Sequence, residues 1–190
     1  MIREETAEFI TQFHVYQYAF LKPEESDFSD SVVKGCKKCV HYKSAWSCPP
    51  AIVSFARCRR ECLSYDGVFV FSTLYESRND DDGEIRRKTR KEHGKVTDFT
   101  SEFFRSKGYE TYTLTSDRCS ICEKCTFPRK ACRYQDRMHP CIESHGIRMS
   151  SLLGRCDMDH FFDEGYSLLF TLIFFRKPPA GSETEANMKG

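Results

Sequence analysis

The chain has 190 residues, of which 39% are hydrophobic and 30% charged, and its formal net charge is +1. Such a composition is typical of a soluble globular protein, and the near-neutral charge gives no bulk electrostatic basis for binding nucleic acid or a membrane surface. No apolar run is long enough to span a bilayer, and the first residues lack the apolar stretch of a signal peptide, so we expect a cytoplasmic protein.

Cysteine is unusually frequent. Eleven cysteines in a chain without an export signal predict thiols or metal ligands rather than disulfides, in a reducing compartment. Oxygen-sensitive metal clusters would further favour an anaerobic cell. We expect one cysteine-rich domain over residues 1–176, followed by a disordered tail at 177–190 that is rich in Pro, Gly, Ser and Glu.

Two helices are predicted in the N-terminal third. Over residues 3–20, apolar side chains recur at helical spacing: Phe9, Ile10, Phe13, Tyr16 and Phe20. Residues 51–63 form the second helix, whose first turn suits Pro49 and Pro50. Cys48 would then lie at a helix N-terminus, where the dipole and free amides favour a thiolate.

The middle of the chain predicts a buried strand at 67–75, a solvated acidic loop at 79–83 and a long charged helix at 84–107 that Gly108 ends. The expected buried stripe of this helix is Ile85, Val96, Phe99 and Phe103. An alternating segment at 109–115 predicts another strand.

In the C-terminal part, Pro140 is expected to open a helix over 141–153 that Gly146 interrupts, and 156–162 forms another short helix. Residues 166–175 are almost wholly apolar, which fits a central strand covered on both faces. The elements together predict an α/β or α+β fold: a small sheet of three or more strands, flanking helices and cysteine-rich metal-binding loops.

The strongest motif is Cys119-x2-Cys122-x2-Cys125-x6-Cys132. It is close to the bacterial ferredoxin run, which has three cysteines at two-residue gaps and a fourth shortly after. A tight loop places three thiolates on three corners of a cubane cluster, whereas a zinc site usually takes two separated pairs. The motif therefore predicts a 4Fe-4S cluster, with zinc as the alternative.

A second cysteine segment reads Cys36-x2-Cys39-x8-Cys48-Pro-Pro. Three cysteines do not complete a four-ligand site. Either a second cluster takes a fourth ligand from elsewhere or keeps an open iron, or a single site mixes cysteines of both segments. The alternative without a cluster is a small zinc knuckle or buried free thiols.

Other candidates are weaker. Cys58 and Cys62 lie four apart on one predicted helix face, where buried thiols are favoured over a metal site, and Cys156 is expected to be inert. Three residues near the second motif are candidate proton donors or ligands, with a surface or capping role favoured for each: His139, Glu143 and His145.

Basic residues surround both cysteine segments: Lys34, Lys37, Lys38, Lys43, Lys124, Arg129, Lys130, Arg133 and Arg137. Because a thiolate-ligated cluster is anionic, these cations either offset its charge or dock an acidic redox partner or small anionic substrate. Trp46, Phe127 and Tyr134 are expected to shield the metal from water.

The two segments together resemble a family of predicted metal-binding proteins of unknown function, found largely in anaerobic bacteria and archaea. The resemblance covers roughly residues 30–150. It rests on a first pattern, Cys36, Cys39, Tyr42, Trp46, Cys48, Pro49 and Pro50, and on a second, Cys119, Cys122, Cys125, Phe127, Pro128, Cys132, Pro140, Glu143, Gly146 and Ile147. Arg and Ser are commoner in the family where this chain has His139 and Cys141, so Cys141 is an additional or substitute ligand candidate. The resemblance implies metal binding and supplies no reaction.

Three functions follow from these observations. The first is an iron–sulfur protein with one or two 4Fe-4S clusters that passes electrons to a partner. The second is an iron–sulfur enzyme whose incompletely ligated iron near Cys36, Cys39 and Cys48 acts as a Lewis acid. The third is a zinc-binding module for RNA or protein. The chain contains no nucleotide-binding loop, dinucleotide fingerprint or serine-nucleophile motif.

Overall fold

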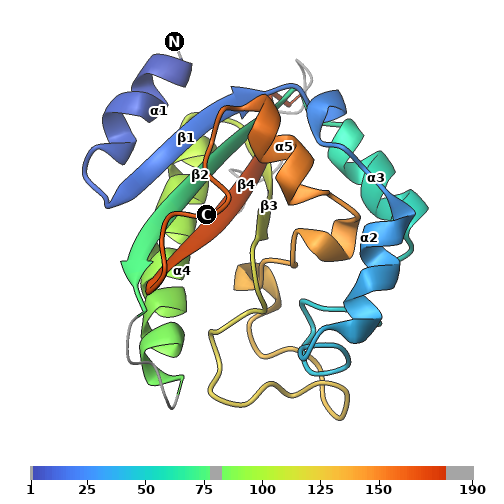
Figure 1. Ribbon diagram of the computed structural model, residues 1–190. Helices are drawn as coiled ribbons and strands as arrows, with labels where there is room; N and C mark the ends of the chain where they lie inside the picture. Colours follow the sequence, from blue (N-terminus) through green and yellow to red (C-terminus); the bar gives the residue numbers. More distant parts are fainter. Residues whose placement is uncertain (1, 78–82, 179–190) are drawn as a thin grey trace, which may run out of the picture.

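The computed structural model describes residues 2–77 and 83–178. Residues 79–82 of the expected loop at 79–83, and residues 179–190 of the expected tail at 177–190, lie outside these described residues. The principal elements follow the order α1 (Ile2–Ile10), β1 (Val15–Leu21), α2 (Asp30–Gly35), α3 (Phe55–Leu63), β2 (Gly67–Glu76), α4 (Glu84–Ser106), β3 (Glu110–Thr115), α5 (Met149–Arg155) and β4 (Tyr166–Arg176). Short 3-10 turns lie at Pro23–Glu25, Cys36–Lys38, Gln135–Arg137 and Glu143–His145. This mixed α+β architecture confirms the predicted fold class (Figure 1).

Four antiparallel strands form one sheet in the order β1-β2-β4-β3. The predicted strands at 67–75, 109–115 and 166–175 are confirmed, and β2 and β4 are the two central strands. Because side chains alternate across a strand, β2 sends Val68 and Val70 to one face of the sheet and Phe69 and Phe71 to the other. Each face is buried in its own hydrophobic cluster.

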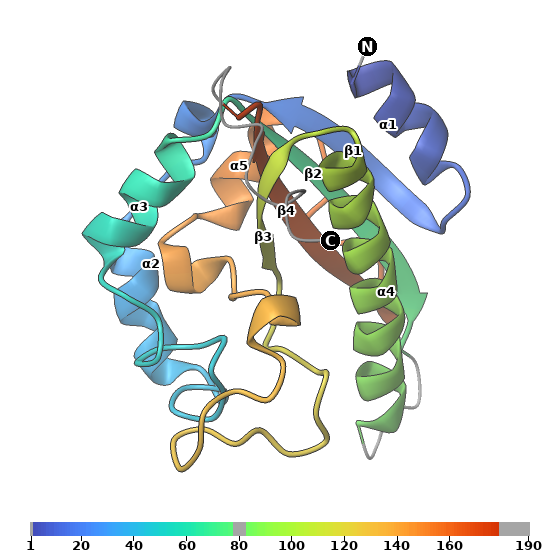
Figure 2. The ribbon, with the colours of Figure 1, turned by 180° about the vertical axis from the view of Figure 1, so that it is seen from behind.

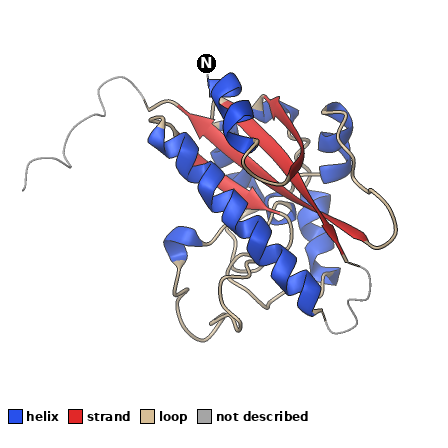
Figure 3. Ribbon diagram, turned by 90° about the vertical axis from the view of Figure 1, so that its left-hand side faces the viewer, coloured by secondary structure: helices blue, strands red, loops and turns tan. Residues whose placement is uncertain are grey.

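The helices cover the two faces of the sheet separately. α1 and α4 lie over one face, where Phe69 packs against Phe104, and α3 and α5 lie toward the other (Figures 2 and 3). Among the described residues, no helix is long and apolar enough to cross a membrane.

The predicted helix over 3–20 is wrong beyond its first half. α1 ends at Ile10, and residues 15–21 form β1 on the edge of β2. A spacing of four residues repeats on one face of a helix and on one face of a strand alike, so Tyr16 and Phe20 fitted both periods. Strand pairing decides the outcome, because Phe20 packs on Phe69 at 4.8 Å between ring centroids.

The helix predicted at 84–107 is confirmed as α4, and Gly108 with φ of +78° follows its end. Its predicted buried stripe is only partly right: Val96 and Phe103 pack partly buried against the core, whereas Phe99 is 57% exposed. The buried face is mostly polar: Thr89, His93, Thr97, Thr100, Ser101 and Phe104. These side chains find partners on the sheet, which apolar counting misses: His93 hydrogen-bonds Thr73 (2.7 Å) and Thr171 (2.9 Å), and Ser101 hydrogen-bonds Thr113 (2.9 Å).

The helix after the two prolines begins at Phe55 rather than at 51. Cys48 to Ala51 instead form a turn, in which Ala51 N–H donates to the Cys48 carbonyl at 3.1 Å. The prediction that Cys48 occupies a helix N-terminus is therefore wrong.

The segment after Pro140 is less helical than predicted. A 3-10 turn at Glu143–His145 and α5 replace the predicted helix over 141–153, and Gly146, with φ of +78°, separates them. The predicted helix at 156–162 is wrong. Asp157 has φ of +53°, a left-handed conformation in which an α-helix does not continue.

Candidate metal centre

The first cysteine motif lies in the long loop between β3 and α5. Its four thiols line one small cavity: Cys119, Cys122, Cys125 and Cys132. All four are partly buried, and residues 116–134 contain no helix or strand, so the loop's turns alone present them. The structure therefore brings together the four cysteines that the spacing had grouped.

Contacts with the N-terminal segment hold this loop in place. Trp46 Nε1 donates to the Lys130 carbonyl at 3.1 Å, and the Trp46 ring meets Phe127 edge-on at 5.0 Å. Within the loop, Thr126 Oγ1 donates to the Ala131 carbonyl at 2.9 Å. The indole thus closes one side of the first cavity against water.

Electrostatic interactions among the thiols of the first set shift the pKa of Cys119. Burial raises the pKa of Cys119, and the neighbouring Cys132, Cys122 and Cys125 raise it further, whereas the Ile121 N–H lowers it. Four thiolates so close together repel one another unless a cation lies between them. This is the charge situation that a bound metal relieves.

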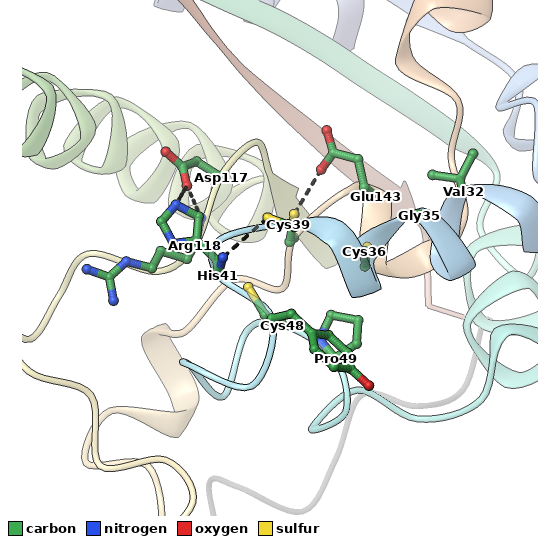
Figure 4. A pocket seen from close by; sticks show the side chains of 12 residues that line it. Val32, Gly35, Cys36, Cys39, His41, Cys48, Pro49, Asp117, Arg118 and Glu143 are labelled. Carbon is green, nitrogen blue, oxygen red and sulfur yellow. Dashed lines mark hydrogen bonds and ion pairs between the residues drawn. The ribbon is translucent and has the colours of Figure 1, made fainter.

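The second motif lines a larger cavity of about 390 Å³ (Figure 4). Cys36 and Cys39 come from the turn that follows α2, and Cys48 comes from the proline turn. A fourth thiol, Cys141, lies in the same cavity and forms an isolated β-bridge with Thr115 at the end of β3. Sequence spacing alone did not group Cys141 with the other three.

In the second set, burial and contacts between neighbouring groups shift the pKa values of the thiols. Interaction with the Cys141 thiol lowers the pKa of Cys48, and the same interaction raises the pKa of Cys141 well above its usual value. Cys141 Sγ also lies 2.8 Å from Glu143 Oε2, to which it donates. Burial raises the pKa of Cys36 to about 11, with Glu143, Cys39 and Cys48 adding to the effect. Cys48 is therefore the readiest thiolate.

One buried residue, Ser47, connects the two sets. Its Oγ accepts the Cys119 N–H at 2.9 Å, and its carbonyl accepts the Cys141 N–H at 3.0 Å. Its chain neighbours Trp46 and Cys48 line the first and second cavities respectively. The two cavities are thus neighbours, and each contains its own four cysteines, whereas a mixed site would draw on both motifs.

The remaining cysteines line neither cavity. Cys58 and Cys62 are buried on α3, where Cys58 Sγ donates to the Val53 carbonyl at 3.5 Å and Cys62 belongs to the hydrophobic core. Burial raises the pKa of Cys62 and, to about 11, that of Cys156. These three thiols therefore lie apart from the two candidate sites.

The histidines predicted as proton donors lie elsewhere. His145 is buried beside the second cavity, where its Nε2 pairs with the Tyr112 hydroxyl at 2.6 Å and burial lowers its pKa to about 4. His139 pairs with Asp98 at 2.9 Å on the far side of the loop. Of the three candidates, only Glu143 lines a thiol cavity.

The donor chemistry of both cavities suits a metal that binds thiolates. Within residues 2–77 and 83–178, no group of three or more His, Cys, Asp or Glu side chains is close enough to hold one metal ion. A tetrahedral zinc site needs sulfurs about 2.3 Å from the metal, hence about 4 Å from one another. A cubane cluster, with its irons at separate corners, accepts thiolates set farther apart around a cavity. Thiolate donors are the ligands that such clusters select.

Comparison with known families gave a match. A family model described as "Predicted metal-binding protein (DUF2284)" matches residues 19–175, which include both cysteine motifs and Cys141. A comparison with curated proteins found no match, and neither did a comparison with solved structures.

Proposed function

The chain belongs to the DUF2284 family of predicted metal-binding proteins, and from this premise we propose that it is an iron–sulfur protein with two 4Fe-4S clusters that transfers electrons. Cys119, Cys122, Cys125 and Cys132 would hold one cluster. Cys36, Cys39, Cys48 and Cys141 would hold the other. The observation that carries the proposal is the presence of two neighbouring cavities, each lined by four cysteines.

A cluster supplies reversible one-electron chemistry, and the chain's own residues set the conditions for it. Backbone N–H groups point at the sulfurs: that of His41 lies 3.4 Å from Cys39 Sγ, and that of Ile121 reaches Cys119. Such hydrogen bonds stabilise the added negative charge and raise the reduction potential. Trp46 and Phe127 exclude water from the first site, which also tunes the potential.

All eleven cysteines are free of disulfide bonds, which supports a reducing cytoplasmic setting for this activity. The exposed lysines and arginines around the loops support docking of an acidic redox partner protein.

A second candidate is an iron–sulfur enzyme, and the size of the second cavity favours it. Glu143, His41 and Asp117 line that cavity beside the thiols. If Cys141 remains a thiol that donates to Glu143, the three other cysteines would leave one iron open as a Lewis acid for substrate. A zinc module that binds RNA or protein is the third candidate.

Iron, zinc and acid-labile sulfide per chain, measured on protein purified without oxygen, test these functions. About eight irons with equal sulfide are expected for two 4Fe-4S clusters. Cys122→Ala is expected to lose about four irons, whereas Cys156→Ala, whose thiol lines neither cavity, keeps all of them. Equal iron content in the two variants would refute the ligand assignment, and zinc without sulfide would refute the redox proposal.

Cys141→Ser separates the first two candidates. Loss of the second cluster, or its conversion to a form with three irons, would support ligation by Cys141. A second cluster that keeps its iron and changes its spectrum when a small ligand is added would instead support the open-iron enzyme.

A further inference from the structure

A narrow cleft lies on the other side of the first cysteine loop, between α4 and the loop. Its volume is about 60 Å³, enough for a few water molecules or one small ion. Arg90 and Asp98 of α4 line it, and Arg118, Arg137 and His139 line it from the loop. Figure 2 shows the loop beside α4 below β3. The cleft is separate from both thiol cavities, although Cys119 and Arg118 each lie on a shared wall.

Two buried guanidinium N–H groups of this cleft lack well-directed hydrogen-bond acceptors. Among the described residues, buried side-chain nitrogen and oxygen atoms without a hydrogen-bond partner occur at Ser26, Ser72, Arg90 and Arg118. The last two are both the Nε atoms of arginines that line the cleft. A buried donor on a charged group is costly to leave unpaired, so two in one place indicate a missing acceptor.

The carboxylates near the cleft do not provide acceptors for the Nε–H groups of Arg90 and Arg118. Asp98 pairs with Arg137 (3.4 Å) and His139 (2.9 Å). Asp117 lies 2.8 Å from Arg90 Nε and 3.0 Å from His41, yet the Arg90 Nε–H is not directed at the carboxylate and makes no hydrogen bond. In the part of the chain that the structure describes, the buried Arg118 Nε–H likewise has no hydrogen-bond acceptor. The cleft therefore carries an excess of positive charge.

We propose that this cleft binds a small oxyanion, of the phosphate or carboxylate class, between Arg90 and Arg118. Guanidinium groups bind the paired oxygens of such anions through two parallel N–H bonds, and the Nε–H groups of Arg90 and Arg118 both lack an acceptor here. Figure 4 shows its side chain extending away from the thiols of the second site, which leaves the guanidinium available to the cleft.

The anion would lie against the first metal site, because Cys119 lines both the cleft and the first cavity. Binding itself does not depend on the proposed function. Its role as the small anionic substrate or effector of an iron–sulfur centre rests on that function, and the two claims fail separately. Loss of iron and sulfide would refute the centre, whereas loss of anion binding would refute only the cleft.

Calorimetric titration of the anaerobically purified protein with inorganic phosphate, and separately with acetate, tests the proposal at constant ionic strength. Millimolar or tighter binding of at least one anion is expected, and the preferred anion identifies the class. Arg118→Gln is expected to weaken binding at least tenfold, since a hydrogen bond to a charged group is removed. Asp98→Asn, which removes a negative charge from the cleft, is expected to tighten binding.

The matched control is Arg129→Gln, which removes an exposed cation of the same loop that does not line the cleft. It is expected to bind the anion as the wild type does. Absence of binding up to about 10 mM of either anion, or equal affinity in the Arg118→Gln and Arg129→Gln variants, would overturn the proposal. If Arg118→Gln does not fold, Arg90→Gln removes the other unmet donor and carries the same expectation.

Discussion

Gly146 is the residue through which the second thiol site depends on the rest of the fold. It lies five residues after Cys141, and its carbonyl accepts the Ser29 N–H at 2.7 Å, next to the start of α2. Its φ of +78° is a left-handed conformation, and a Cβ placed on it would meet the Phe55 ring and lie 2.9 Å from the Ser29 carbonyl oxygen. Alanine therefore fits neither the backbone nor the space.

Gly146→Ala is expected to lower the free energy of unfolding by about 2–5 kcal/mol. The left-handed conformation costs a residue with a Cβ about 1–2 kcal/mol, and overpacking against a ring and a carbonyl adds about 1–3 kcal/mol. Because the clash displaces Ser29 and hence α2, which leads into Cys36 and Cys39, we expect the second site to lose metal while the first keeps it.

Urea unfolding and metal content per chain measure both effects. The control is Gly154→Ala in α5, where nothing lies within 4 Å of the added Cβ. There the helix propensity of alanine is expected to stabilise the protein by about 0.5–1 kcal/mol. If the two variants have the same stability and the same metal content, Gly146 does not constrain the position of α2, and the coupling to the second site is wrong.

Three further substitutions probe the core and the junction between the sites. Burial lowers the pKa of His93 from 6.5 to about 4, so the unfolded chain binds an extra proton and stability falls as pH drops through this window. The wild type should lose up to about 3 kcal/mol by this route, which urea unfolding at each pH would detect, and an unchanged slope in His93→Gln would contradict it. Ser47→Ala leaves the partly buried Cys119 N–H without its acceptor, which should cost about 1–3 kcal/mol and loosen the first metal site. Thermal unfolding and metal retention against a chelator would show both effects. Tyr112→Phe removes the 2.6 Å contact to His145 and should cost a similar 1–3 kcal/mol, and wild-type stability in this variant would exclude a buried hydrogen bond there.

Much of the fold was predictable because its signals are local. The apolar runs of β2 and β4 and the length of α4 each fit one period only. β1 was missed because a four-residue spacing fits both helix and strand, and the buried face of α4 was missed because its polar side chains find partners only across the sheet. Tertiary pairing, which no local pattern records, decided both cases.

The candidate metal centre likewise has one part that local sequence spacing predicts and one part that only tertiary pairing brings together. The four cysteines from 119 to 132 are close in sequence, so spacing alone groups them. Cys141 joins Cys36, Cys39 and Cys48 only because the end of β3 pairs with it across a 26-residue gap. One signal was available: the second motif lacked a fourth ligand, and Cys141 is the next cysteine after the completed first motif. The anion cleft gave no such signal, since α4 and the loop supply its residues separately.

The polar face of α4 also determines how accurately the helix is placed. A helix that meets a sheet through aliphatic side chains alone can slide or rotate slightly at little cost, because apolar contacts are not directional. Here such a movement would break several directional bonds together, including those of His93 and Ser101 and the 2.7 Å contact between Thr97 and Thr171. A fully satisfied buried network of this kind favours a single arrangement. Arg90 and Asp98 therefore face the cysteine loop from a helix whose height and rotation on the sheet are fixed.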